Sequence, residues 1–126
     1  MDFQDQKAIY LQIADLIEER ILTQVWKERI PAIRELAAEL KVNPNTIART
    51  YAHLETQGII STQRGIGYFV SFDARTRILA ARKEVFLKKS APEFLKTLAL
   101  LNIRLEDLKE LCQNPHFQIH KENDDF

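Results

Sequence analysis

Residues 33–51 read IRELAAELKVNPNTIARTY, and the architecture of the chain can be worked out from this stretch. Apolar residues recur at helical spacing from Ile33 to Leu40, which predicts a short amphipathic helix. Lys41-Val42-Asn43 then separates it from a second helix that begins at Pro44. Asn43 is a preferred N-cap, and proline at the first helical position loses no hydrogen bond, because the N–H there has no helical partner. Two helices joined by so short a turn predict a helix-turn-helix, which presents its second helix to the major groove of DNA.

The flanking segments supply the remaining parts of a winged helix. Apolar residues spaced by three and four predict an amphipathic helix at 8–23, and the position before Pro31 favours a short strand or turn at Arg29-Ile30. The second helix of the pair is expected to end near Gln57, before the helix terminator Gly58. A β-hairpin is expected next, with strands at 59–62 and 68–70 and a turn at 63–67.

The chain after Arg75 is predicted to be helical. One helix is expected at 76–89, and a capping box of Ser90 and Glu93 is expected to start another that reaches Leu101. A last short helix is expected at 105–111, before Asn114-Pro115 ends it.

This helical part has about fifty residues, which are too few for an independent core. Its apolar stripes are therefore expected to pack against the same segment of a second subunit in a two-fold dimer. The expected dimerisation residues are Ile78, Val85, Phe86, Leu95, Leu98, Leu101, Leu105 and Leu108. The alternative is that these stripes pack on the winged helix of their own chain.

We therefore predict a mostly α fold with a small β-hairpin, of the α+β class. The predicted domains are a winged helix-turn-helix DNA-binding domain at 1–71, a helical dimerisation region at 72–114 and a polar C-terminal tail at 115–126. The expected partners are a double-stranded DNA operator and a second copy of the chain.

The start of the second helix carries side chains of the types that can read DNA. Asn43 and Asn45 have the amide that pairs with adenine, Thr46 can contact phosphate or a thymine methyl, and Arg49 can reach guanine or phosphate. At the hairpin tip, the position of Arg64 suits entry into the minor groove or contact with the backbone. Each residue also has a plain structural alternative: a helix cap for Asn43, a solvent-facing helical position for Thr46, and a solvated surface charge for the arginines.

Charge and composition are compatible with DNA binding and argue against a membrane-spanning or secreted protein. The chain has 126 residues, with 18 Lys plus Arg against 18 Asp plus Glu, so its net charge is zero. The basic residues are segregated, with six between Arg75 and Lys89, and with Lys41, Arg49 and Arg64 in a segment whose only acid is Glu55. A single cysteine fits a reducing compartment, and neither a bilayer-spanning stretch nor a signal peptide is evident, so we expect a cytoplasmic protein and no membrane partner.

No constellation of reactive groups predicts an enzyme. Cys112, His116 and His120 recur every four residues, but Pro115 interrupts a helix that would align them. Gly65-Ile66-Gly67 lacks the third glycine of a phosphate-binding loop. We expect no catalytic residue, no metal and no cofactor, and we predict no particular small-molecule effector.

Five blocks together resemble the GntR family of bacterial regulators. They are IYLQI at 9–13, IPAIRELA at 30–37, VNPNTIARTY at 42–51, GII at 58–60 and RGIGYFV at 64–70. The resemblance covers about residues 7–71. The short helical remainder is similar to the YtrA-type subfamily, which has a small dimerising tail of helices in place of a large effector domain.

The resemblance implies a homodimer that binds a palindromic operator, usually as a repressor, often beside transporter genes. It places DNA contacts at Arg34, Asn43, Asn45, Thr46 and Gly65. The chain departs from the family where Ala32 replaces a common serine and where Pro44 and Ala48 stand at arginine positions of larger relatives. Phosphate contacts are therefore expected to depend on Arg34, Arg49 and Arg64. The alternative function is a winged helix that binds protein without specific DNA binding.

Overall fold

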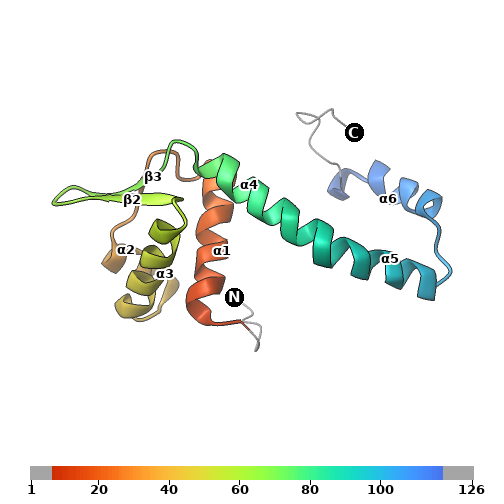
Figure 1. The fold of residues 1–126 in the computed structure, drawn as a ribbon, viewed down its shortest axis with the longest axis horizontal. Coiled ribbons are helices and arrows are strands. Elements are labelled where there is room, and N and C mark those ends of the chain that lie inside the picture. The colour runs from red at the N-terminus through yellow and green to blue at the C-terminus, as the bar shows by residue number, and fades with distance from the viewer. Residues whose placement is uncertain (1–6, 118–126) are drawn as a thin grey trace. The chain divides into compact units, whose positions relative to one another are not determined.

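Three helices and a three-stranded antiparallel sheet make up most of the first of two units in this computed structural model, which describes residues 7–117 (Figure 1). The helices are α1 (Ile9–Leu22), α2 (Ile33–Leu40) and α3 (Pro44–Thr56). The strands are β1 (Arg29–Ile30), β2 (Ile60–Gln63) and β3 (Gly67–Val70), in the order β1-β3-β2. The predicted winged helix-turn-helix is confirmed, and the strand at Arg29–Ile30 enlarges the predicted hairpin into a sheet.

The register of the sheet ties the wing to the rest of the unit. Ile60 pairs with Val70 and Gln63 with Gly67 in the hairpin, while Arg29 pairs with Phe69 on the other side of β3. Because β3 is the central strand, it is hydrogen-bonded on both of its edges, and β1 thereby anchors the base of the wing.

The core of the first unit lies where the three helices and the base of the sheet meet. Ile13 and Ile17 of α1, with Ile47 and Leu54 of α3, are fully inaccessible to solvent. Leu36 of α2 joins the same cluster. Burial of one such aliphatic side chain contributes about 1.5–3 kcal/mol.

The turn between α2 and α3 is closed by two local devices. Lys41 adopts a left-handed conformation, with φ 57° and ψ 47°, at the C-cap of α2. Asn43 is the N-cap of α3, as predicted: its side-chain oxygen accepts a hydrogen bond from the Asn45 backbone N–H at 2.8 Å, and Pro44 follows as the first helical residue. These caps set where each helix stops and starts.

Most of α4 (Ala74–Val85) also belongs to the first unit, which extends to Arg82. The Arg82 Nε atom donates to the Glu18 carboxylate at 3.0 Å, and its Nη2 donates to the Asp15 carbonyl at 2.9 Å. Arg75 donates to the Leu22 carbonyl, at the C-terminal end of α1, at 2.7 Å. α4 is thus held along α1 by its arginines.

The inclusion of Ile78 among dimerisation residues was wrong. Ile78 is 1% exposed and packs in the core of the winged-helix unit, together with Ala74. The sequence pattern gave Ile78 a helical stripe but did not show which partner that stripe meets.

In the second unit, the chain from Lys83 continues as the end of α4, the π-helical turn η1 (Phe86–Ser90) and α5 (Ala91–Leu100). The predicted capping box at Ser90 is wrong: Ser90 has helical angles, φ −68° and ψ −42°, and its side chain makes no cap hydrogen bond. Pro92 has no N–H and its ring crowds the preceding turn of an α-helix. A π-turn just before it widens the backbone at that point, so the chain remains helical where the sequence predicted a restart.

The last described elements are short: the 3₁₀ turn η2 (Leu105–Leu108), α6 (Lys109–Gln113) and the 3₁₀ turn η3 (Pro115–Phe117). Residues 118–126 of the predicted polar tail, including His120, lie outside the described residues. Among residues 7–117, no helix is both long and apolar enough to cross a bilayer. Within the same range, no three His, Cys, Asp or Glu side chains are grouped to hold a metal ion.

Candidate nucleic-acid interface

The N-terminal end of α3 presents polar side chains at the surface. Asn45 is exposed and Thr46 is half-buried, one turn before the buried Thr50. Asn43 uses its side-chain oxygen as the helix cap, which leaves its amide NH₂ as the group still free to donate. The structure therefore brings these three predicted residues together at one helix end, with Asn43 committed in part to capping.

Arg49 lies one turn further along α3 and is stacked on an aromatic ring from α1. Its guanidinium carbon is 3.9 Å from the centroid of the Tyr10 ring. A hollow of about 340 Å³ lies in the same place and is lined by Ala8, Ile9, Tyr10, Asn45, Thr46 and Arg49. The N-terminal ends of α1 and α3 lie at the same end of the unit (Figure 1). Sequence reasoning missed this role of Tyr10, because the tyrosine also fits the apolar stripe of α1.

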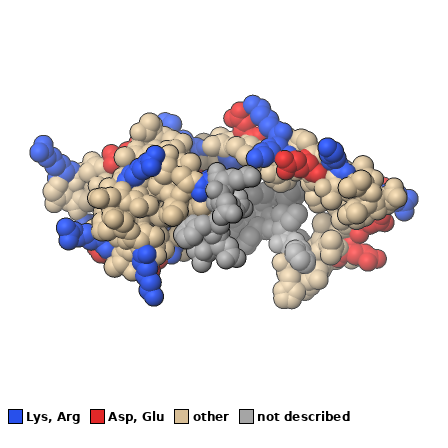
Figure 2. Space-filling view, turned by 90° about the horizontal axis from the view of Figure 1, so that it is seen from below, with Lys and Arg blue, Asp and Glu red and all other residues tan. Residues whose placement is uncertain are grey.

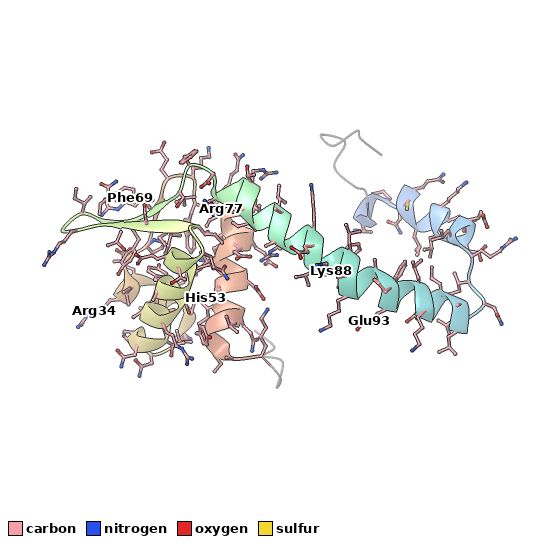
Figure 3. All side chains as sticks on the ribbon, viewed as in Figure 1. Arg34, His53, Phe69, Arg77, Lys88 and Glu93 are labelled. Atoms are coloured by element: carbon pink, nitrogen blue, oxygen red, sulfur yellow. The ribbon has the colours of Figure 1, made fainter. Side chains whose placement is uncertain are left out.

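Arg34 stands in the first turn of α2 and projects into solvent, away from the body of the unit (Figure 3). Its neighbour Glu35 belongs to the same exposed turn. The position suits contact with a DNA backbone beside the major groove, because helix N-terminal N–H groups also favour a phosphate there.

Arg64 and Gly65 lie in the turn of the wing. The Ile66 N–H closes this turn by donating to the Gln63 carbonyl at 2.9 Å. Gly65 has φ +77° with open space around it, so its backbone can approach a ligand closely. The structure places Arg64 and Gly65 at the tip of the hairpin, at a separate place on the unit from the end of α3.

Arg29 braces the wing from β1, a role that sequence reasoning missed. Its guanidinium donates to the Ile66 carbonyl in the wing turn and lies 5.7 Å from the centroid of the Phe69 ring. A Cβ atom on Gly67 would come within 3.0 Å of the same guanidinium. The one sequence feature that indicates this contact is Gly67, because a glycine in a strand often marks a place where another group approaches the backbone.

The charged groups divide into those used inside the fold and those left at its surface. Nine arginines lie within residues 7–117. Six of them form a hydrogen bond or ion pair with another residue of the chain: Arg20, Arg29, Arg75, Arg77, Arg82 and Arg104. Within the described residues, Arg34, Arg49 and Arg64 have none.

Much of the positive charge in the basic segment at 75–89 is paired within the chain. Arg75 and Arg82 are bound to α1, and Lys88 pairs with Glu84 at 2.6 Å. The segment 41–68, which contains α3, has Glu55 as its only acidic residue. The Glu55 carboxylate accepts a hydrogen bond from the Thr62 hydroxyl at 2.7 Å. Where the first unit is visible in Figure 2, lysine and arginine side chains project with little acidic surface between them.

The buried phenol of Tyr51 holds α3, the predicted DNA-reading helix (below, the reading helix), against the chain just before α2. The Tyr51 hydroxyl donates to the Pro31 carbonyl at 2.7 Å, and its ring packs edge-on against Tyr68 at 4.7 Å between centroids. Burial, with smaller contributions from Tyr68, Glu35 and Glu39, raises the pKa of the Tyr51 phenol above its usual range. The phenol therefore stays neutral and keeps its proton for the hydrogen bond at physiological pH.

Comparison with known proteins identifies the family. The model of the gntR family of bacterial regulatory proteins matches residues 9–70, which span α1 to the end of β3. The HTH-type transcriptional regulator YhcF of Bacillus subtilis is 37% identical over 110 residues, which cover 86% of this chain and 89% of YhcF. The chain belongs to the GntR family. This GntR regulator shares its fold and its class of function, regulation of transcription, with that relative.

The predicted likeness to YtrA-type regulators is also confirmed. The HTH-type transcriptional repressor YtrA of Bacillus subtilis is 32% identical over 112 residues, covering 87% of this chain and 85% of YtrA. A GntR family transcriptional regulator from Listeria monocytogenes superposes with a TM-score of 0.69 at 35% identity, over 88% of this chain and 97% of the other. These relatives are transcriptional regulators and not enzymes, and the likeness includes the helical part that follows the winged helix.

Proposed function

We propose that this GntR regulator is a sequence-specific repressor that binds a palindromic operator as a homodimer. The observation that carries the proposal is the set of three unpaired arginines. Among residues 7–117, Arg34, Arg49 and Arg64 are the arginines that make no hydrogen bond or ion pair within the chain. Each keeps five N–H donors for an acceptor outside the protein, and phosphate and guanine are the acceptors that a guanidinium fork fits best.

The three arginines stand on three different elements, which divides the work of binding. Arg49, with Asn45 and Thr46, belongs to the helix that enters the major groove, so this group reads base edges. Arg34 at the start of α2 contacts phosphate, and Arg64 with Gly65 contacts the adjacent minor groove or its backbone. Asn43 caps α3 and offers its amide NH₂ to the same groove.

The second unit supports dimerisation through its uncovered apolar surface. Large apolar side chains in this unit are 49–80% exposed: Val85, Phe86, Leu87, Phe94, Leu95, Leu100, Leu101, Leu105 and Leu111. Soluble monomers rarely leave so many apolar groups exposed in so few residues. A second copy of the same surface covers them in a two-fold arrangement. Of the predicted dimerisation residues, Leu98 is buried and Leu108 is half-buried, so they offer less surface to a partner than the others.

A two-fold dimer presents two reading helices to half-sites about one helical turn apart, roughly 34 Å on B-DNA. Two copies also double the number of phosphate contacts, which raises the affinity of a chain of zero net charge for DNA. We further propose, as the resemblance implies, that the regulated genes encode a transporter; transcript levels in a strain lacking the protein test this.

Selection of duplexes from a random-sequence pool, followed by anisotropy titrations, tests DNA binding. The wild type is expected to select one palindromic sequence. Arg49→Ala is expected to weaken specific binding by roughly 10-fold or more while leaving non-specific binding nearly intact. Arg34→Ala is expected to reduce the slope of log K against log salt by about 1.8, because each dimer loses two phosphate contacts. Lys96→Ala removes one charge from α5, on the side away from Leu98, and serves as the control with no change. Selection of no sequence by the wild type would favour a protein-binding winged helix instead.

Sedimentation equilibrium tests the dimer separately. Leu95→Asp places a charge on a half-exposed apolar position and is expected to raise the dimer dissociation constant by roughly 100-fold or more, with the helical circular dichroism retained. Lys96→Ala is again the matched control on the neighbouring position. A wild type that is monomeric at micromolar concentration contradicts the proposed interface.

A further inference from the structure

We propose that Tyr10 is a positioning residue for Arg49 and that it makes the N-terminal end of α1 part of the DNA-reading site. The inference rests on the proposed DNA-binding function of α3 and adds a residue from a different helix to it. It arises from one contact between distant parts of the sequence, in which the Arg49 guanidinium lies 3.9 Å from the Tyr10 ring centroid.

The contact holds Arg49 without using its hydrogen-bond donors. A guanidinium over an aromatic face is attracted by the ring quadrupole, so no N–H has to point at a protein acceptor. Arg82 of the first unit differs from Arg49 in this respect, because its Nε and Nη2 atoms donate to the Glu18 carboxylate and the Asp15 carbonyl. Arg49 is therefore oriented by the protein and still has its full set of donors for a base or a phosphate.

The Tyr10 ring is itself held in place from α3. His53 packs against it edge to face, with centroids 5.9 Å apart and planes at 83°. The Tyr10 backbone also meets α3, because the buried Thr50 hydroxyl lies 2.9 Å from the Tyr10 carbonyl and 2.9 Å from the Thr46 carbonyl, which share its one proton. Arg49 and His53 are four residues apart on one stripe of α3, and Tyr10 contacts both (Figure 3 labels His53). The His53 ring restricts the Tyr10 side chain, and Tyr10 in turn restricts the orientation of the Arg49 guanidinium.

The surroundings of the contact are continuous with the reading residues. Ala8 and Ile9 of the α1 end line the same hollow as Asn45, Thr46 and Arg49. A DNA strand that meets Asn45 and Arg49 therefore passes the first turn of α1. Orientation of a charged side chain before binding lowers the entropy lost when the complex forms, since a long side chain gives up about 0.5–1.5 kcal/mol when immobilised at an interface.

A double-mutant cycle on operator affinity tests the inference. The probe is the duplex that the wild type selects from a random pool, and the proteins are the full-length wild type, Tyr10→Leu, Tyr10→Phe, Arg49→Ala and Tyr10→Leu/Arg49→Ala. Tyr10→Leu is expected to weaken binding by about 2- to 5-fold per half-site, or about 4- to 25-fold for a dimer. Tyr10→Phe keeps the ring face and is expected to remain close to wild type. In the Arg49→Ala background, Tyr10→Leu is expected to have no further effect.

A measurement without DNA keeps the inference testable if Tyr10→Leu folds poorly. Stacking on the Tyr10 ring shifts the NMR signals of the Arg49 side-chain protons upfield, and Tyr10→Phe is expected to retain that shift. Absence of the shift in the wild type, or an equal loss of affinity from Tyr10→Leu with and without Arg49, overturns the positioning role while DNA binding stands. Failure of the wild type to select any duplex overturns the proposed function and this inference together.

Discussion

Replacement of Tyr51 by phenylalanine tests how the reading helix is fixed in the helix-turn-helix. Tyr51 is 1% exposed, and its hydroxyl donates to the carbonyl of Pro31, which is the residue before the N-cap of α2. The substitution removes one partly buried hydrogen bond and leaves the carbonyl without that donor. A hydrogen bond of this kind contributes about 0.5–1.5 kcal/mol net, and an unsatisfied buried acceptor costs about 1–3 kcal/mol. We expect Tyr51→Phe to lower the free energy of unfolding by about 1–2 kcal/mol at pH 7.

The same substitution has a pH dependence of known sign. The pKa of the Tyr51 phenol is raised in the folded state, chiefly by burial, so the folded state holds this proton more tightly than the unfolded chain does. The resulting stability is fully present below the unfolded pKa of about 10 and is lost as pH rises above it. The loss is about 1.4 kcal/mol per pH unit, and the phenylalanine of the variant has no proton to lose. The wild type and the variant are therefore expected to become about equally stable near pH 11.

Urea unfolding followed by circular dichroism, at one protein concentration and at pH 7, 9, 10 and 11, measures both effects. The concentration is fixed because dissociation of a dimer is coupled to unfolding. Tyr68→Phe is the matched control, since it removes a hydroxyl from the ring that packs on Tyr51 and this hydroxyl has no hydrogen-bond partner among residues 7–117. Equal stability of Tyr51→Phe and wild type at pH 7 would refute the stabilising bond. A difference that stays constant up to pH 11 would refute the raised pKa.

Three further outcomes are expected from other local features. Lys41→Gly is expected to raise the free energy of unfolding by roughly 0.5–1 kcal/mol in urea titrations, because Lys41 has φ 57°, whereas Lys41→Ala is expected to give no gain. Gly67→Ala is expected to lower the free energy of unfolding by about 1–3 kcal/mol, because Gly67 has φ +144° and a new Cβ there displaces the Arg29 guanidinium. It is also expected to lower operator affinity in anisotropy titrations. Unchanged DNA binding would exclude the Arg29 contact as one that positions the wing. Arg82→Ala is expected to lower the free energy of unfolding, measured by thermal melting, by about 1 kcal/mol, because its bonds to α1 are only partly shielded from solvent. A similar loss in Lys83→Ala would show that the effect is general to α4.

The helix-turn-helix could be predicted closely because its determinants are local. α2 begins and ends at the predicted residues, Ile33 and Leu40, and α3 begins at Pro44 behind its Asn43 cap. Apolar spacing, an N-cap and a proline act within one or two turns of the chain, so they are legible without knowledge of the tertiary structure. The same local reasoning failed at Ser90, where a serine and a glutamate three residues apart are typical of a capping box but lie in continuous helix around a π-turn.

The order of the elements, the polar N-terminal end of α3 and the family could all be predicted from the sequence. Only the tertiary structure shows the pairs that join residues far apart in the sequence, such as Arg82 with Glu18 and Arg29 with the wing turn. It also decided that Ile78 belongs to the winged-helix core and that Tyr10 lies under Arg49. Composition counts an arginine as a charge wherever it lies. Packing determines whether that arginine's N–H donors are spent inside the fold or left for DNA, and no local pattern records that difference.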